Sequence, residues 1–295
     1  MIGTGGVAAM AGALAALYGA FVFAVHRGFR APRTHPRQTP ADFQLPFETV
    51  AIPTARGRRL SAWFVPPRTP SAPAVILIHG WGGNADNLLP LAPALHEAGL
   101  GVLLLEARGH GNSEPDGFSS LPKFAEDLQA AIEWVGRRPD GHPRPIGLAG
   151  HSVGAAAALL AASRDERVGA VASLASFAHP AELMGRIMTA RGILVRPLRH
   201  WVLRYVERKI GASYDEIAPV TTIGRIRAPV LLIHGEADRR VPLDDARTLY
   251  ARRRRGNVRL WTLPGVGHES FSALIKYAPR VAAFFRDNLD AQTSL

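Results

Sequence analysis

The sequence predicts an α/β fold in which helices cover both faces of a mostly parallel, eight-stranded sheet. Short, continuously apolar segments such as 75–78 and 102–105 are typical of strands buried on both faces, as parallel strands are. Segments with helical spacing, such as 121–138, alternate with these strands along the chain, which is the pattern of a sheet covered on both sides. The chain has 295 residues, of which 47% are hydrophobic, enough for one large core.

An apolar segment, residues 2–25, opens the sequence and contains no charged side chain. It is long enough to cross a bilayer as a helix, which takes about 20 residues, although many Gly and Ala lower its hydrophobicity. Arginines follow it directly within 27–37, and no Lys or Arg precedes it. A cleaved signal peptide has basic residues before its apolar stretch, and this segment has none there. We therefore expect an uncleaved transmembrane anchor over 1–26, in a single-pass protein of the cell membrane whose main domain is cytoplasmic.

Prolines at 32, 36 and 40, spaced among charged residues, predict an extended linker over 27–46. The remaining residues, 47–295, form one large domain in this prediction. Its first two strands, 47–52 and 60–65, are joined by a glycine turn and predict an antiparallel hairpin at the edge of the sheet.

The composition excludes several classes of site. The chain has no cysteine, so disulfides, thiolate catalysis and cysteine-ligated zinc are excluded. The formal net charge of +11 is scattered and is not interleaved with aromatic residues, so we expect no nucleic-acid partner, whereas anionic lipid headgroups remain compatible with it. The sequence contains no metal motif, and no glycine-rich dinucleotide motif follows the first strand, so neither a metal nor a cofactor is expected.

The segment Gly150-His151-Ser152-Val153-Gly154 joins an apolar strand, 146–149, to an Ala/Leu-rich helix. A serine at the tip of such a sharp turn adopts a strained backbone, which requires small residues two positions to either side. Gly150 and Gly154 meet this requirement. The pattern predicts a nucleophile elbow that exposes Ser152 above the sheet; the alternative is an ordinary Gly/Ser turn.

A second glycine-rich loop, 79–84, follows the buried strand 75–78. Glycines at this place let backbone N–H groups approach a ligand, so we expect an oxyanion hole formed by the N–H groups of Trp81 and Val153. His79 is expected to order this loop. A third polar loop, 106–113, follows strand 102–105, and there we expect His110 to pack within the loop rather than to act as a base.

The alternation of strands and helices is interrupted between residues 177 and 225 by helix-like segments, including 183–188 and 198–210. An insertion between strands at the carboxyl edge of the sheet predicts a cap over the site. Ordinary connecting helices are the alternative.

Two further polar residues complete a constellation with Ser152. Asp238 follows the strand 230–233, and His268 follows the last strand, 258–263, beside Gly267. All three thus come after predicted parallel strands and fall on one edge of the sheet. A serine hydroxyl becomes nucleophilic when an imidazole takes its proton, and an acid fixes the tautomer of that imidazole.

With these motifs in place, residues 47–289 resemble the α/β-hydrolase superfamily, and most of all its serine-aminopeptidase-like and membrane-anchored members. The resemblance rests on the motifs His79-Gly80-Trp81-Gly82-Gly83-Asn84, Arg108-Gly109-His110-Gly111-Asn112-Ser113, Gly150-His151-Ser152-Val153-Gly154, His234-Gly235-Glu236-Ala237-Asp238 and Gly267-His268. One departure is Glu106, where the family often has Asp in a structural role.

The resemblance implies an α/β-hydrolase fold with Ser152 as nucleophile, Asp238 as acid, His268 as base, and Trp81 and Val153 as oxyanion donors. The expected activity is hydrolysis of an ester, with a small, hydrophobic or lipid-like acyl substrate. Thioesterase and peptidase activity stay open, as do a membrane-tethered scaffold that only binds and cofactor-free halide or peroxide chemistry by the same trio.

Overall fold

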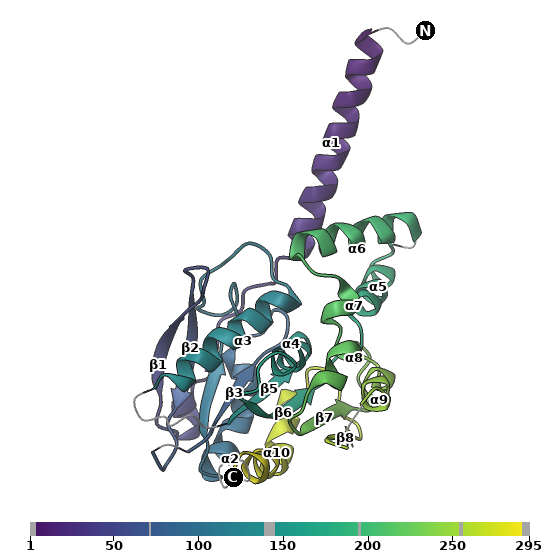
Figure 1. The fold of residues 1–295 in the computed structure, drawn as a ribbon. Helices are drawn as coiled ribbons and strands as arrows, with labels where there is room; N and C mark the ends of the chain where they lie inside the picture. The colour runs from purple at the N-terminus through teal and green to yellow at the C-terminus, as the bar shows by residue number, and fades with distance from the viewer. Residues whose placement is uncertain (1–3, 71, 139–144, 194–195, 254–255, 291–295) are drawn as a thin grey trace.

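The computed structural model describes residues 4–70, 72–138, 145–193, 196–253 and 256–290, and Figure 1 shows their arrangement. Eight strands form one sheet with the order β1-β2-β4-β3-β5-β6-β7-β8. The strands are β1 (Glu48–Pro53), β2 (Arg59–Val65), β3 (Ala74–Ile78), β4 (Gly101–Leu105), β5 (Ile146–His151), β6 (Val168–Leu174), β7 (Val230–Gly235) and β8 (Val258–Leu263).

The pairing of the strands confirms the predicted mostly parallel sheet and the hairpin at its edge. Strand β2 pairs antiparallel with β1 and with β4, and every other neighbouring pair is parallel. Consequently the carboxyl ends of β3 to β8 meet at one edge of the sheet, where loops from distant parts of the sequence come together.

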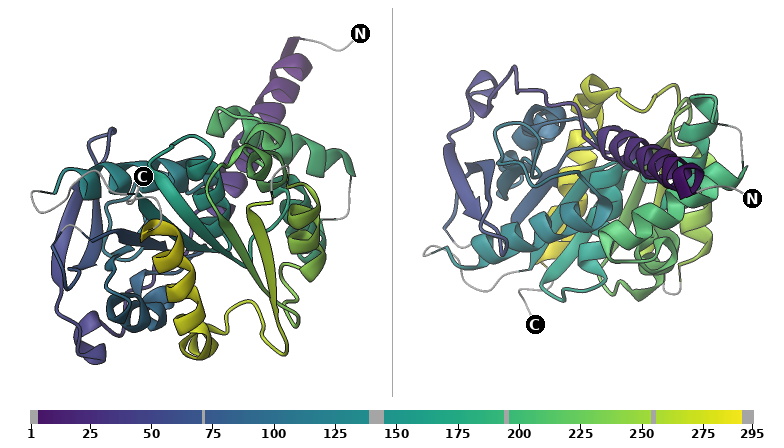
Figure 2. Two further views of the ribbon diagram at one scale, coloured as in Figure 1. Left: turned by 60° about the horizontal axis from the view of Figure 1, so that its bottom comes forward. Right: turned by 90° about the horizontal axis from the view of Figure 1, so that it is seen from above.

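Helices cover both faces of the sheet, as Figure 2 shows from two further directions. The helices that follow α1 (Thr4–Gly28) along the chain are α2 (Ala92–Glu97), α3 (Leu121–Gly136), α4 (Val153–Ala162), α5 (Pro180–Ala190), α6 (Arg196–Ile210), α7 (Tyr214–Ile217), α8 (Pro219–Thr222), α9 (Leu243–Ala251) and α10 (Leu274–Asp290). Short 3₁₀ helices are η1 (Pro40–Phe43), η2 (Ala85–Leu91), η3 (Ile223–Arg225) and η4 (Phe271–Ala273).

The central strands are apolar at every position because they are buried on both sides. In β3, Ile76 and Ile78 belong to the core shared with α3 and α4, whereas Val75 and Leu77 belong to the core shared with η2, α2 and α10. All four side chains are at most 1% exposed. Alternate residues of one strand therefore hold the helices on opposite faces, which fixes the strand register relative to both layers.

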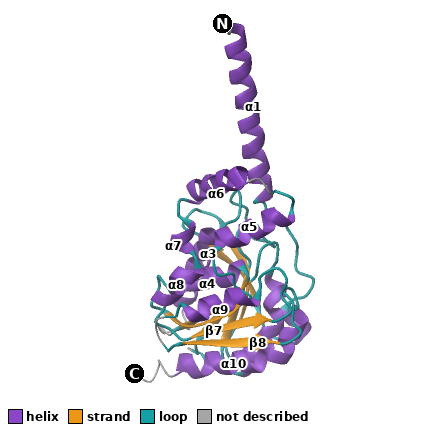
Figure 3. Cartoon of the chain, turned by 90° about the vertical axis from the view of Figure 1, so that its right-hand side faces the viewer, coloured by secondary structure: helices purple, strands orange, loops and turns teal. Residues whose placement is uncertain are grey.

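Helix α1 (Thr4–Gly28) projects from the domain, as Figure 3 shows from the side. Its segment Gly6–Gly28 is long and apolar enough to cross a membrane, and its most apolar stretch is entirely unburied. Leu17 and Phe23, for example, are 68% and 70% exposed. An apolar helix with no protein contact over most of its length is a candidate membrane span.

Helices α5 to α8 are inserted between β6 and β7, at the position of the predicted cap. His179 caps the start of α5 by accepting the Ala181 N–H at 3.2 Å, and Ser213 caps α7 by accepting the Glu216 N–H at 3.2 Å. Val206 of α6 is 3% exposed and joins the core that includes α3 and α4.

Candidate active site

Ser152 lies at the sharp turn between β5 and α4. Its backbone has φ 55° and ψ −116°, a conformation that L-residues rarely adopt. A Cβ on Gly150 would lie 2.3 Å from the Gly154 carbonyl oxygen, and one on Gly154 would lie 2.3 Å from the His79 carbonyl oxygen. Both positions therefore require glycine, because the elbow is pressed against its own helix and against the end of β3.

Ser152, His268 and Asp238 form a chain of hydrogen-bonding distances at the carboxyl edge of the sheet. The Ser152 Oγ lies 3.1 Å from His268 Nε2, and His268 Nδ1 lies 2.6 Å from Asp238 Oδ2. An ionised carboxylate only accepts, so Nδ1 carries the proton and the Nε2 lone pair faces the serine hydroxyl. In this tautomer the imidazole is able to take the serine proton.

Asp238 is held in a fixed orientation by the backbone of its own loop. Its Oδ1 accepts the N–H groups of Arg240 at 2.9 Å and Val241 at 2.8 Å, which leaves Oδ2 for His268. Burial acts to raise the pKa of this carboxyl, but the hydrogen bonds from His268 and the Val241 N–H outweigh it and lower the pKa below its usual value. The group is therefore a carboxylate at neutral pH.

His151 orders the loop that carries His268, a role that the sequence analysis did not identify. Its Nε2–H donates to the His268 carbonyl oxygen at 2.8 Å, and the two ring centroids are 4.8 Å apart. Burial, together with the nearby His268, lowers the pKa of His151 to about 3, so its ring is neutral. The position of His151 inside the elbow motif was the only signal available in the sequence.

The loop after β3 passes beside the serine. A Cβ on Gly80 would lie 2.8 Å from the His151 Nδ1 and 3.3 Å from the Ser152 Cβ, so a larger residue at this position would force the two segments apart. His79 orders the loop: its Nδ1–H donates to the Gly80 carbonyl at 2.7 Å, and its Nε2 accepts the Ala107 N–H at 3.1 Å. Burial lowers the pKa of His79 to about 3. Trp81 follows on this loop, and Val153 begins α4 directly after the serine.

A segment between α1 and β1 also contacts this loop. We call residues 29–37 the strap. Thr34 Oγ1 donates to the Gly82 carbonyl at 2.8 Å, and the Phe29 ring lies edge-on to Trp81 with centroids 6.4 Å apart. The Arg33 Nε–H donates to the Gly111 carbonyl at 2.7 Å. The expected linker thus packs on two of the glycine-rich loops, contacts that proline spacing in the sequence did not reveal.

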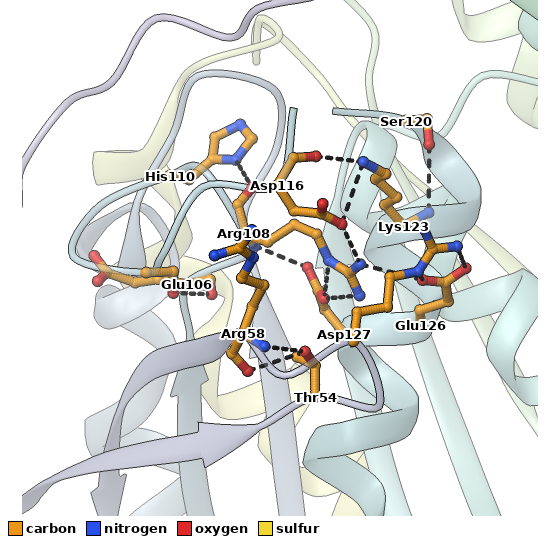
Figure 4. Close-up of polar contacts among 12 residues, drawn as sticks. Thr54, Arg58, Glu106, Arg108, His110, Asp116, Ser120, Lys123, Glu126 and Asp127 are labelled. Carbon is orange, nitrogen blue, oxygen red and sulfur yellow. Dashed lines mark hydrogen bonds and ion pairs between the residues drawn. The ribbon is translucent and has the colours of Figure 1, made fainter. Parts of the chain in front are cut away.

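The loop 106–113 is supported by buried polar contacts, shown in Figure 4. Arg108 pairs with Asp127 of α3 at 2.6 Å, with both side chains at most 3% exposed, and with Asp116 at 3.1 Å. Glu106 accepts the Asn112 N–H at 2.7 Å. His110 is fully buried against His79 and donates from Nδ1 to the Arg108 carbonyl at 3.1 Å. Within the described residues these groups hold the loop together.

A cavity of about 970 Å³ lies in the inserted helices, between α5 and α6. Its walls carry both charges, from Glu182, Arg186, Arg199 and Asp215 among others. Arg186 is itself paired with Asp245 at 2.5 Å. Ser152 and His268 do not line this cavity, so it is separate from the chain of hydrogen bonds described above. Among the described residues, no cluster of His, Asp and Glu is arranged to hold a metal ion.

Comparisons with known proteins agree with this architecture. Residues 73–193 match the family model described as alpha/beta hydrolase fold. The uncharacterized protein Rv2307c of Mycobacterium tuberculosis (strain ATCC 25618 / H37Rv) is 34% identical over 221 residues, covering 74% of this chain and 71% of that protein. The uncharacterized protein YfhR of Escherichia coli (strain K12) is 32% identical over 210 residues, covering 69% and 67%.

Among solved structures, one that is similar is the Pyrococcus furiosus esterase Pf2001. It superposes with a TM-score of 0.71 at 23% identity, and the match covers 88% of this chain and 98% of the esterase. At this identity the likeness establishes a common fold.

Proposed function

This chain belongs to the α/β-hydrolase fold family, and from that premise we propose that it is a serine hydrolase that cleaves an ester of a hydrophobic or lipid-like acyl group. The observation that carries the proposal is the continuous set of contacts from Asp238 through His268 to the Ser152 Oγ, at 2.6 and 3.1 Å. Esterases among the structural neighbours support hydrolysis as the reaction class.

In the proposed mechanism, His268 Nε2 takes the proton of Ser152 as Oγ attacks the ester carbonyl carbon. The backbone N–H groups of Trp81 and Val153 donate to the oxyanion, and Asp238 stabilises the imidazolium that forms. His268 then gives its proton to the departing alcohol, which leaves an acyl-enzyme. A water molecule, deprotonated by the same nitrogen, hydrolyses this acyl-enzyme and restores the serine hydroxyl.

We also propose that helix α1 anchors the enzyme in the cell membrane as a single pass, with the hydrolase domain, residues 47–295, in the cytoplasm. Arg27 and Arg30 directly follow the apolar part of α1, and arginines gather on the cytoplasmic side of membrane spans. Residues 27–46 connect the anchor to the domain, and the helices within about 177–225 form its cap. A membrane-anchored hydrolase has direct access to lipid-like esters, which is the reason for assigning that substrate class.

A substrate panel tests the reaction type. The detergent-solubilised full chain is given nitrophenyl esters of increasing acyl length, together with matched thioesters, amides and a monoacylglycerol. We expect ester hydrolysis that is faster for longer acyl chains than for acetate. Preferential turnover of the thioester or the amide would assign a thioesterase or a peptidase instead, and no turnover of any of them would favour a binding scaffold.

Replacing His151 tests how the base is positioned. In His151→Leu the hydrogen bond to the His268 carbonyl is lost, and we expect kcat to fall by about 100-fold with little change in KM, because small misplacements of a base are costly. His151→Gln keeps an N–H donor near the same carbonyl and should recover part of kcat. If His151→Leu lowers only the melting temperature and leaves kcat unchanged, His151 does not position the base.

A further inference from the structure

The outward face of helix α6 combines an exposed tryptophan with basic residues. Val206 points toward the domain and is 3% exposed, whereas Trp201 is 69% exposed. Arg204 and Arg208 are also exposed, and they follow Trp201 at helical spacings of three and seven residues. Such spacings place the three side chains on one side of a helix, opposite Val206. We call Trp201, Arg204 and Arg208 the outward face of α6.

Helix α6 lies across the base of α1, as Figures 1 and 3 both show. The His26 Nε2 lies 2.9 Å from the Tyr205 hydroxyl, and the rings of Phe21 and Tyr205 meet edge-on with centroids 5.5 Å apart. These contacts fix the last turns of α1 to α6. The rest of α1 extends away from the domain, on the side toward which the outward face of α6 points.

The free length of α1 sets where α6 would lie relative to a bilayer. From Gly6, where the apolar span begins, to His26, whose ring meets Tyr205 of α6, the helix rises roughly 30 Å at 1.5 Å per residue, which matches the hydrocarbon thickness of a bilayer. The level of His26, where α6 contacts α1, is therefore the level at which hydrocarbon gives way to lipid headgroups. The outward face of α6 then lies parallel to the membrane surface.

The chemistry of this face suits that position. Tryptophan prefers the membrane interface, where its apolar ring and its N–H group are both accommodated. Arginines close to a bilayer are attracted to anionic headgroups. Arg27, in the last turn of α1, and Arg30, two residues after its end, add positive charge close to the level of His26.

We propose that the outward face of α6 is a second membrane contact, which binds anionic phospholipid headgroups and places the Trp201 ring at the bilayer interface. The inference rests on α1 crossing the membrane, which is part of the proposed function. It assigns to the inserted helices a role besides that of a cap: they hold the domain at a fixed orientation on the bilayer surface.

Because the chain has no cysteine, single cysteines give unambiguous spin-label sites. Three variants of the full chain are labelled in nanodiscs: Leu14→Cys for the anchor, Trp201→Cys for α6, and Glu97→Cys as a reference site. Glu97 is exposed and lies at the end of α2, shortly before β4 and thus at the amino-terminal edge of the sheet. Collisions with oxygen, which enriches in lipid, are compared with collisions with a water-soluble nickel chelate. Ester hydrolysis by each labelled protein verifies folding.

In nanodiscs that contain phosphatidylglycerol, we expect the oxygen-to-chelate collision ratio to be at least tenfold higher at site 14 than at site 97, and several-fold higher at site 201 than at site 97. Lipid exposure at site 14 with full water exposure at site 201 would overturn the inference and leave the anchor standing. Water exposure at both sites would refute the anchor as well. Neither result bears on hydrolysis, which is measured separately.

A second set of variants tests whether the contact of α6 with lipid requires its positive charge. Arg208→Glu, combined with Trp201→Cys, should lower the collision ratio at site 201 several-fold in anionic nanodiscs. Arg252→Glu makes the same charge change at the end of α9, at the opposite edge of the sheet, and should leave the ratio unchanged. Equal ratios in anionic and purely zwitterionic nanodiscs would contradict headgroup binding, and protection from both reagents would indicate a protein partner in place of lipid.

Discussion

Ser152→Ala is expected to lower kcat for ester hydrolysis by about 10⁵- to 10⁶-fold, the scale of effect when a nucleophile of this type is removed. In the proposed mechanism the Ser152 Oγ forms the acyl-enzyme, so no neighbouring group replaces it. A fluorophosphonate probe should label the full-length wild-type chain at Ser152 and should not label the variant. The melting temperature should change little, because alanine keeps the Cβ and the same backbone conformation.

Ser163→Ala is the matched control for this experiment. Ser163 ends the same helix, α4, and its hydroxyl donates to the Leu160 carbonyl at 2.7 Å, far along the helix from Ser152. Its replacement should leave both labelling and turnover near the wild-type values. Labelling that persists in Ser152→Ala, with esterase activity retained, would remove Ser152 from the reaction.

Asp238→Asn is expected to lower kcat by about 10⁴-fold while leaving the loop geometry intact. The two backbone N–H groups of Arg240 and Val241 need an acceptor, so the amide oxygen of the new asparagine takes the place of Oδ1. Its NH₂ group then faces His268 Nδ1. That nitrogen must now accept, which moves the imidazole proton to Nε2 and points an N–H at the serine. The base is then unable to take the serine proton.

The control for this variant is Glu236→Gln. Glu236 is exposed and lies two residues before Asp238, and its replacement by glutamine removes the same charge. We expect it to keep kcat within about twofold, since surface substitutions of this kind have small effects. Proton NMR of the downfield imidazole N–H signals would follow the tautomer of His268 directly. A kcat for Asp238→Asn close to that of Glu236→Gln would show that the carboxylate does not set the tautomer.

The fold was predictable from the sequence because its signals are local and repeated. The apolar segments 75–78 and 102–105 were predicted as buried strands, and the structure has β3 and β4 there. The type of a helix is harder to predict than its presence. Residues Ala85 to Glu97 form the 3₁₀ helix η2 followed by α2, with Pro90 inside η2. Proline lacks the N–H that a continuous α-helix needs at this position.

The site was predictable to a smaller extent. The order of Ser152, Asp238 and His268 along the chain, each after a strand, was enough to propose that they converge, because parallel strands end at a common edge. The support from His151 depends on a contact with a carbonyl 117 positions away in the sequence, and no local pattern reports such a contact. The same holds for the strap, whose Thr34 meets Gly82 across 48 positions.

The contact of the strap with Gly82 has a practical consequence for preparing this protein without helix α1. A shortened chain that begins at Phe47, directly before β1, would lack Thr34 and Arg33. The carbonyl groups of Gly82 and Gly111 would then lose the hydrogen bonds that these two side chains donate in the intact protein. Trimming at that point would therefore disturb the loops 79–84 and 106–113, which the strap contacts in the intact chain. The shortest chain that keeps these contacts, together with that of Phe29 on Trp81, starts at Phe29, immediately after the last residue of α1.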